Sequence, residues 1–183
     1  MKLILASKSP RRIKILKEHG YKFEIIPSNT TEKTKYKRPH LIVMDLAKRK
    51  AKNVALKYPN DLIIAADTIV YCKGKIIGKP KDKNDAKRLL RIQSGRWQKV
   101  YTGLAVICVN KNIEIIDYDK SECYMRNLTK KEIDEISSKH LDKAGGWGVQ
   151  DKNDMIIKKI KGSYYNVVGL PIEKLNKILK KIL

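Results

Sequence analysis

The sequence contains few of the residues that build disulfide networks, metal clusters or aromatic binding surfaces. Its 183 residues include three cysteines, three histidines and one phenylalanine, and aromatic residues make up only 7%. Cys72, Cys108 and Cys123 lie far apart in apolar stretches, which predicts reduced thiols in the core. The histidines are equally scattered, which argues against a zinc site.

Long apolar runs are also missing. None approaches the roughly 18 to 20 residues that cross a bilayer. The apolar segment Met1–Ala6 meets Pro10 almost at once, so it indicates a strand and not a signal peptide. Hydrophobic residues still make up 42%, enough for a core. We therefore expect a soluble, cytoplasmic protein with no membrane partner, folded as one domain over residues 1–183 or as two small lobes that share a core.

The charge is strongly one-sided, with 41 basic against 19 acidic residues and a net charge of +22. Such a surface attracts nucleic acids and phosphates. The excess is mostly lysine, with only eight arginines, and it is spread along the whole chain. A proteome-wide lysine bias would give the same numbers, and the aromatic and glycine pattern of RNA-binding modules is missing. These features argue against dedicated nucleic-acid binding.

Apolar periodicity predicts an α/β protein. The expected strands are 3–5, 23–26, 62–66, 68–71, 75–77, 100–109, 113–118, 145–150 and 155–160. The expected helices are 9–20, 40–58 and 82–92, with two more that begin at 129 and 171. Because hairpins interrupt the crossovers, for example at Lys73–Gly74, the sheet should be mixed, with flanking helices.

Four segments could carry chemistry. Ser7–Arg12 places hydroxyl groups, a helix N-terminus and two guanidinium groups together, which suits either a phosphate site or a solvated basic turn. Asp67 ends a buried strand, where it could hold Mg²⁺, activate water or merely cap a turn. Gly78–Pro80 fixes Lys79 for a phosphate, or forms an ordinary turn. The glycine-rich stretch 143–150 would let the backbone approach a ligand, but it lacks P-loop spacing.

Together these segments match a known family. Eight blocks occur in the family's order: Leu5–Arg12, Leu46–Ala51, Ala66–Val70, Gly78–Pro80, Ser94–Arg96, Thr102–Gly103, Asp142–Gly145 and Asn166–Pro171. Along nearly its whole length the chain resembles the Maf family of nucleoside triphosphate pyrophosphatases, which are hydrolases acting on acid anhydrides. The resemblance implies a single Maf-like domain with two lobes around a central cleft, akin to inosine triphosphate pyrophosphatases, and leaves a homodimer open.

The resemblance also implies roles for individual residues. Asp67 is expected to accept a proton, to bind a divalent cation (Mg²⁺ or Mn²⁺), or both, with Glu32 as a second metal ligand. The expected phosphate-binding residues are Arg12, Lys50 and Lys79. The expected substrate-selecting residues are Arg11, Thr68 and Gln150.

These last three residues resemble the subfamily that converts dTTP or UTP to the monophosphate and pyrophosphate. The 7-methyl-GTP pyrophosphatase branch typically has Trp, Gln and Glu instead, and it remains the first alternative. A basic, non-catalytic division regulator that binds nucleic acid is the second. The chain departs from the family pattern at Gln98, at Lys139–His140 and at Trp147, where the family often has His, Glu-Pro and Tyr.

Overall fold

The computed structural model describes residues 1–149 and 155–182. The chain forms two compact units. Unit 1 comprises Met1–Asp67, Thr102–Asp119 and Gly169–Leu183, and unit 2 comprises Thr68–Tyr101 and Lys120–Val168. The strand order is β2-β1-β3-β5-β6-β7, with β4 paired to β3. Strands β3 (Leu62–Cys72), β5 (Trp97–Cys108) and β6 (Ile113–Met125) contribute residues to both units.

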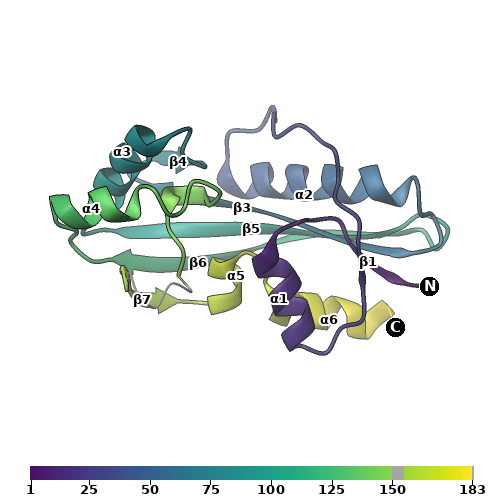
Figure 1. Cartoon of the computed structure of the whole chain (residues 1–183). Coiled ribbons are helices and arrows are strands. Elements are labelled where there is room, and N and C mark those ends of the chain that lie inside the picture. The colour runs from purple at the N-terminus through teal and green to yellow at the C-terminus, as the bar shows by residue number, and fades with distance from the viewer. Residues whose placement is uncertain (150–154, 183) are drawn as a thin grey trace. The chain divides into compact units, whose positions relative to one another are not determined.

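Unit 1 is built around a parallel β-strand pairing. Strand β1 (Leu3–Leu5) pairs in parallel with both β2 (Glu24–Ile25) and the first residues of β3. Helix α2 covers one face of these strands, whereas α1 and α6 lie on the other face (Figure 1). The bounds of these helices are Pro10–Glu18 for α1, Pro39–Ala55 for α2 and Ile172–Ile182 for α6. Small side chains dominate the α2 interface, so the helix lies close to the sheet: Ala6, Ala47, Ala51, Ala55, Ala65 and Ala105.

One glycine sets how closely α2 approaches strand β5. A Cβ atom at Gly103 would lie 2.1 Å from the carbonyl oxygen of Val43, which is backbone and cannot move aside cheaply. Any side chain at this position would therefore push the helix away. Lys50 lies two turns after Val43 on the same helix, so Gly103 also fixes how far Lys50 stands from the sheet.

Unit 2 has its own apolar core. Its remaining elements are β4 (Lys75–Ile77), α3 (Lys83–Gln93), α4 (Lys130–Ile136), the 3₁₀ turn η1 (Ala144–Gly146), β7 (Ile157–Lys161) and α5 (Tyr164–Val168). Helices α3 and α4 lie on the same side of the strands (Figure 1). Leu89, Leu90, Ile133 and Ile136 of these helices pack against strand residues that include Met125. Strand β7 pairs antiparallel with β6, so the sheet is mixed, as the sequence predicts.

Most predicted elements are confirmed, including the hairpin turn at Lys73 and Gly74, whose φ angles of 50° and 74° suit a two-residue turn. The three buried cysteines are free thiols, also as predicted. In the part of the chain that the structure describes, no helix is long and apolar enough to cross a membrane.

The predicted strand at 145–150 is wrong over its described residues. Gly145 and Gly146 have φ angles of 82° and 73°, which a β-strand does not accommodate, and they form a 3₁₀ turn. The short helix α5 was not predicted, because Tyr and Val favour strands. Ser163 promotes this helix by accepting a hydrogen bond from the backbone N–H of Asn166 at 3.1 Å.

Candidate functional site

Asp67 lies in the middle of the buried strand β3. The five residues before it, Leu62–Ala66, are almost fully buried, because β1 flanks the strand and the apolar face of α2 covers it. Asp67 itself is only 7% exposed. A carboxylate at this depth needs a partner, since burying an unpaired charge is costly.

Lys50 of α2 is that partner. Its Nζ lies 2.5 Å from Oδ1 of Asp67 and 3.7 Å from Oε1 of Glu32. The side chains of Lys50 and Asp67 are 15% and 10% exposed, whereas that of Glu32 is 57% exposed. One ammonium group therefore lies within ion-pair distance of a shielded and a solvent-facing carboxylate.

The loop that carries Glu32 is held against α2 by hydrogen bonds on both sides of that residue. The Arg49 guanidinium donates to the carbonyl oxygen of Lys33. The backbone N–H of Asn29 donates to Oδ1 of Asn53 at 3.0 Å. Lys50, Arg49 and Asn53 all belong to α2, so one helix positions both the ammonium group and the loop.

Arg12 lies in the first turn of α1, where a cation is disfavoured by the helix dipole. Hydrogen bonds offset this cost, because Nε donates to the carbonyl oxygen of Gly169 at 2.8 Å and Nη1 lies 3.2 Å from Oγ of Ser7. The same hydroxyl accepts the backbone N–H of Ser9 at 3.2 Å. Arg12 thus ties the loop after β1 to the segment before α6.

Arg12 lies within electrostatic range of both carboxylates. Burial lowers the pKa of its guanidinium below the ordinary value; the negative charge of Asp67 opposes this shift, Arg11 adds to it, and Glu32 opposes it. Arginine remains charged at neutral pH despite such a shift. Unit 1 therefore brings together four of the predicted site residues, with Arg11 beside them: Arg12, Glu32, Lys50 and Asp67.

The carboxylates suit a divalent cation that also binds substrate. Within residues 1–149 and 155–182, no three His, Cys, Asp or Glu side chains gather closely enough to hold a metal ion. Asp67 and Glu32 nevertheless share one cation, the Lys50 ammonium, and offer hard oxygen ligands. Mg²⁺ commonly takes one or two carboxylates and completes its shell with water and phosphate oxygens, so these residues fit such an ion.

Two predicted site residues belong to unit 2. Thr68 follows Asp67 on β3 and is partly buried, whereas Lys79 is exposed between Gly78 and Pro80. The carbonyl oxygen of Gly78 accepts the backbone N–H of Gly145 at 3.0 Å, which fixes this turn. Gln150, which the sequence analysis expects to select substrate, lies outside the residues that the structure describes.

The sequence analysis singles out Lys50 and Glu32 only through the family resemblance. A signal for Lys50 is nevertheless present. It lies four residues after Leu46 and four before Val54, both buried, so it occupies the apolar stripe of its own helix. A lysine in such a stripe is a candidate for an ion pair with a buried carboxylate. Glu32 has no comparable signal, because its loop has no periodicity.

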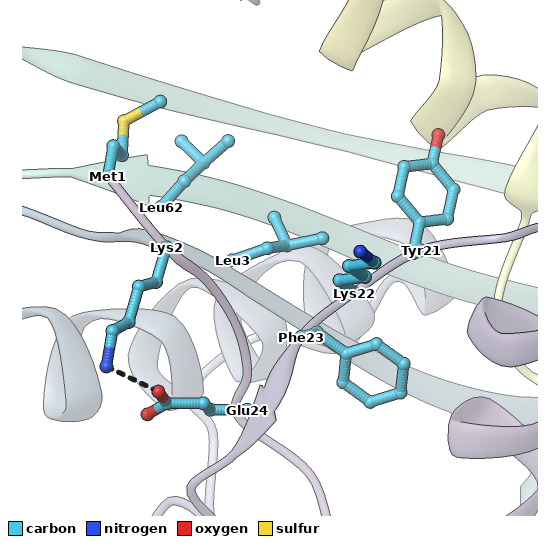
Figure 2. Close-up of a pocket in the computed structure, with 8 residues that line it drawn as sticks. All are labelled: Met1, Lys2, Leu3, Tyr21, Lys22, Phe23, Glu24 and Leu62. Atoms are coloured by element: carbon cyan, nitrogen blue, oxygen red, sulfur yellow. Dashed lines mark hydrogen bonds and ion pairs between the residues drawn. The ribbon is translucent and has the colours of Figure 1, made fainter.

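A hollow in unit 1 is separate from these residues. It is lined by Met1, Lys2, Leu3, Tyr21, Lys22, Phe23, Glu24 and Leu62, and Figure 2 shows its Lys2–Glu24 ion pair of 2.6 Å. These residues include the first ones of β1 and β3, whereas Asp67 comes five residues after Leu62. Ligands of open α/β sheets bind at the carboxyl ends of the strands, so we do not assign the site to this hollow.

The sequence is similar to known proteins over nearly its whole length. The dTTP/UTP pyrophosphatase of Elusimicrobium minutum is 53% identical over 99% of this chain and 98% of its own length. The proteins of the same name from Caldicellulosiruptor bescii and Bacillus anthracis are 43% and 44% identical, over 99% and 98% of this chain and 94% and 95% of their own.

The fold is also found in a solved structure. The Ham1 protein of Staphylococcus aureus superposes with a TM-score of 0.60 at 13% identity, over the full length of both chains. This likeness confirms the expected mixed α/β fold. The sequence profile of the Maf-like proteins matches residues 2–182. The chain belongs to the Maf family.

Proposed function

We propose that this protein is a nucleoside triphosphate pyrophosphatase that hydrolyses dTTP and UTP to the monophosphate and pyrophosphate. The observation that carries the proposal is the shielded Asp67 carboxylate, held by Lys50 and with Glu32 in reach of the same ammonium group. Full-length relatives named dTTP/UTP pyrophosphatase support the choice of substrate. We place the reaction in the cytoplasm, where its substrates are made.

Asp67 is the proposed proton acceptor. It takes a proton from the attacking water, whose oxygen bonds to the α-phosphorus. The bond from the α-phosphorus to the bridging oxygen breaks, and that oxygen leaves with pyrophosphate. Lys50 contributes by donating to Oδ1, which fixes the orientation of the carboxylate.

Three cations are proposed to offset the phosphate charge: Arg12, Lys50 and Lys79. Preorganised cations in a partly dry site stabilise developing negative charge more strongly than they would in water. The Arg12 guanidinium is preorganised by its bonds to Gly169 and Ser7.

A divalent cation, Mg²⁺ or Mn²⁺, would be held by Asp67 and Glu32. When bound, such an ion supplies charge neutralisation at the triphosphate oxygens. Arg11, Thr68 and Gln150 are proposed to select the base, because their side chains can donate to and accept from the hydrogen-bonding edge of thymine or uracil.

The test is a pyrophosphate-release assay on the purified protein. We expect turnover of UTP and dTTP well above that of the purine triphosphates and of 7-methyl-GTP, stoichiometric release of monophosphate and pyrophosphate, and loss of activity with a chelator. Faster turnover of 7-methyl-GTP would support the alternative branch. Release of orthophosphate, or no turnover of any triphosphate, would overturn the proposal.

A further inference from the structure

Gln93, at the end of α3, is fully buried in unit 2 and uses both ends of its amide. Its Oε1 accepts the indole N–H of Trp147 at 2.7 Å. Its Nε2 donates to the carbonyl oxygens of Gly145 at 2.8 Å and Leu89 at 2.9 Å. One side chain therefore ties the helix to the glycine-rich segment at two points.

The turn at Gly145 is shaped to admit this pair. A Cβ atom there would lie 2.4 Å from Nε1 of Trp147 and 2.9 Å from Oε1 of Gln93, so a side chain would displace the hydrogen bond. The φ angle of 82° is itself unfavourable for other residues. Glycine is thus required at this position both by space and by backbone conformation.

The same turn holds the two neighbours of Lys79. The backbone N–H of Gly145 donates to the carbonyl oxygen of Gly78 at 3.0 Å. A Cβ atom at Gly146 would lie 3.5 Å from Cγ of Pro80, which is ordinary packing distance. The chain from Gly78 to Pro80 therefore rests on a turn whose position is set by Gln93.

We propose that Gln93 and Trp147 form a positioning pair that orients Lys79 toward the substrate phosphates. The inference rests on the proposed function, because it takes Lys79 as a phosphate ligand. An apolar residue at 93 would fill the core equally well, since Leu89 and Leu90 beside it already pack there. A fully satisfied buried amide instead specifies one arrangement of the segments that it joins.

Three variants test the pair: Gln93→Met, Trp147→Phe and the combination of both. Gln93→Met keeps the volume but removes all three hydrogen bonds, and Trp147→Phe leaves Oε1 of Gln93 buried without its donor. The double variant no longer contains the unpaired Oε1 atom, so its thermal stability should recover toward that of the wild type. The hydrogen bond that anchors the turn at Gly145 should remain lost.

We expect KM for UTP to rise on the order of tenfold in Gln93→Met and in the double variant, with kcat changed less than about threefold. Calorimetry with inorganic pyrophosphate should show an affinity loss of similar size. Leu89→Ala is the matched control, because it opens a cavity in the same core but keeps the Leu89 carbonyl group. It should lower the melting temperature without raising KM.

The outcomes separate this inference from the proposed function. If the wild type hydrolyses UTP but KM and pyrophosphate affinity in Gln93→Met stay within twofold of it, the positioning role is overturned and the function stands. If the wild type does not hydrolyse UTP but its pyrophosphate affinity depends on Gln93, the function fails and the positioning role is supported. A wild type that does neither overturns both.

Discussion

The Asp67 carboxylate is shielded from water, forms an ion pair with the ammonium of Lys50 and lies within electrostatic range of the Arg12 guanidinium. A neutral amide of the same size would keep the packing but lose both the proposed base and the negative charge that pairs with Lys50. The two functions of the carboxylate can therefore be tested by one substitution.

We predict that Asp67→Asn lowers kcat for UTP by about 10² to 10⁴, the range typical of a lost general base. The measurement is steady-state turnover at saturating metal, with circular dichroism to confirm folding. Asp61→Asn is the matched control. Asp61 directly precedes the same strand, and its exposed carboxylate accepts the backbone N–H of Lys2. Asp67→Asn activity above about a tenth of the wild type would contradict the assignment.

Lys79 is exposed, so its removal should leave the core intact. We predict that Lys79→Ala lowers kcat/KM for every accepted triphosphate by a similar factor, on the order of tenfold or more, because its proposed role is to bind phosphate and not the base. Kinetics with UTP, dTTP and 7-methyl-GTP provide the measurement, and Lys75→Ala, also exposed, is the control. Opposite responses of UTP and 7-methyl-GTP would make Lys79 a specificity residue instead.

At the scale of elements, helix α4 begins with a capping box that the sequence predicts. The Thr129 Oγ accepts the backbone N–H of Glu132 at 3.3 Å, and the Glu132 carboxylate accepts the backbone N–H of Thr129 at 2.8 Å. A hydrogen bond from Arg126, together with those from Thr129, lowers the pKa of Glu132 to about 2. The ionised carboxylate is therefore the form that stabilises this helix end.

The sign of the pH dependence follows from that shift. A pKa lowered by folding adds stability above the ordinary value of 4.5, and this stability is lost as the pH falls toward about 2. We predict that Glu132→Gln lowers the free energy of unfolding by up to about 1 kcal/mol at pH 7, since the pair is partly exposed. Urea unfolding at several pH values should show the difference shrinking below about pH 4. Glu135→Gln on the same helix is the control for the loss of one negative charge.

Element prediction succeeded where local signals and packing agree. The helix that begins at Pro10 and the hairpin at Lys73–Gly74 carry their own start and turn signals. The strand predicted after Ala144 is wrong, because the conformation of this segment is set by contacts with Gln93 and Gly78, which are far away in sequence. The predicted strand ends at Tyr118 because the residues after it are polar. In the structure β6 continues to Met125, where it pairs with β7.

The prediction of site residues likewise succeeds where the signal is local and fails where it depends on contacts between distant residues. Asp67 and Lys79 could be singled out from strand-end and turn chemistry alone. The Lys50–Asp67 pair could not, because it joins a helix to a strand 17 residues away and depends on how closely α2 packs. Periodicity reveals which side of α2 is buried, but not which strand residue faces a given turn.

At the scale of the whole molecule, the residues proposed to select the base come from three separate segments of the chain. We predict that replacing Arg11, Thr68 and Gln150 together with Trp, Gln and Glu strongly depresses kcat/KM for UTP and dTTP. A polar site left with unpaired groups rejects a base by factors that can reach about 10⁴. Turnover of 7-methyl-GTP should rise, because an aromatic face and a carboxylate suit a cationic purine.

The measurement is the ratio of kcat/KM for UTP to that for 7-methyl-GTP, in the wild type and in the triple variant once its folding is confirmed. We expect a change of at least about tenfold, equivalent to about 1.4 kcal/mol. A smaller change would show that discrimination resides elsewhere in the chain.

The division into two units has a consequence for how such a gene can change. The chain passes from one unit to the other four times, after residues 67, 101, 119 and 168. Neither unit is therefore encoded by an uninterrupted run of codons. Recombination that exchanges one continuous stretch of DNA can import a segment of one unit, but it cannot import a complete unit without segments of the other. New substrate preferences should consequently arise by changes within these segments, and not by exchange of a complete unit.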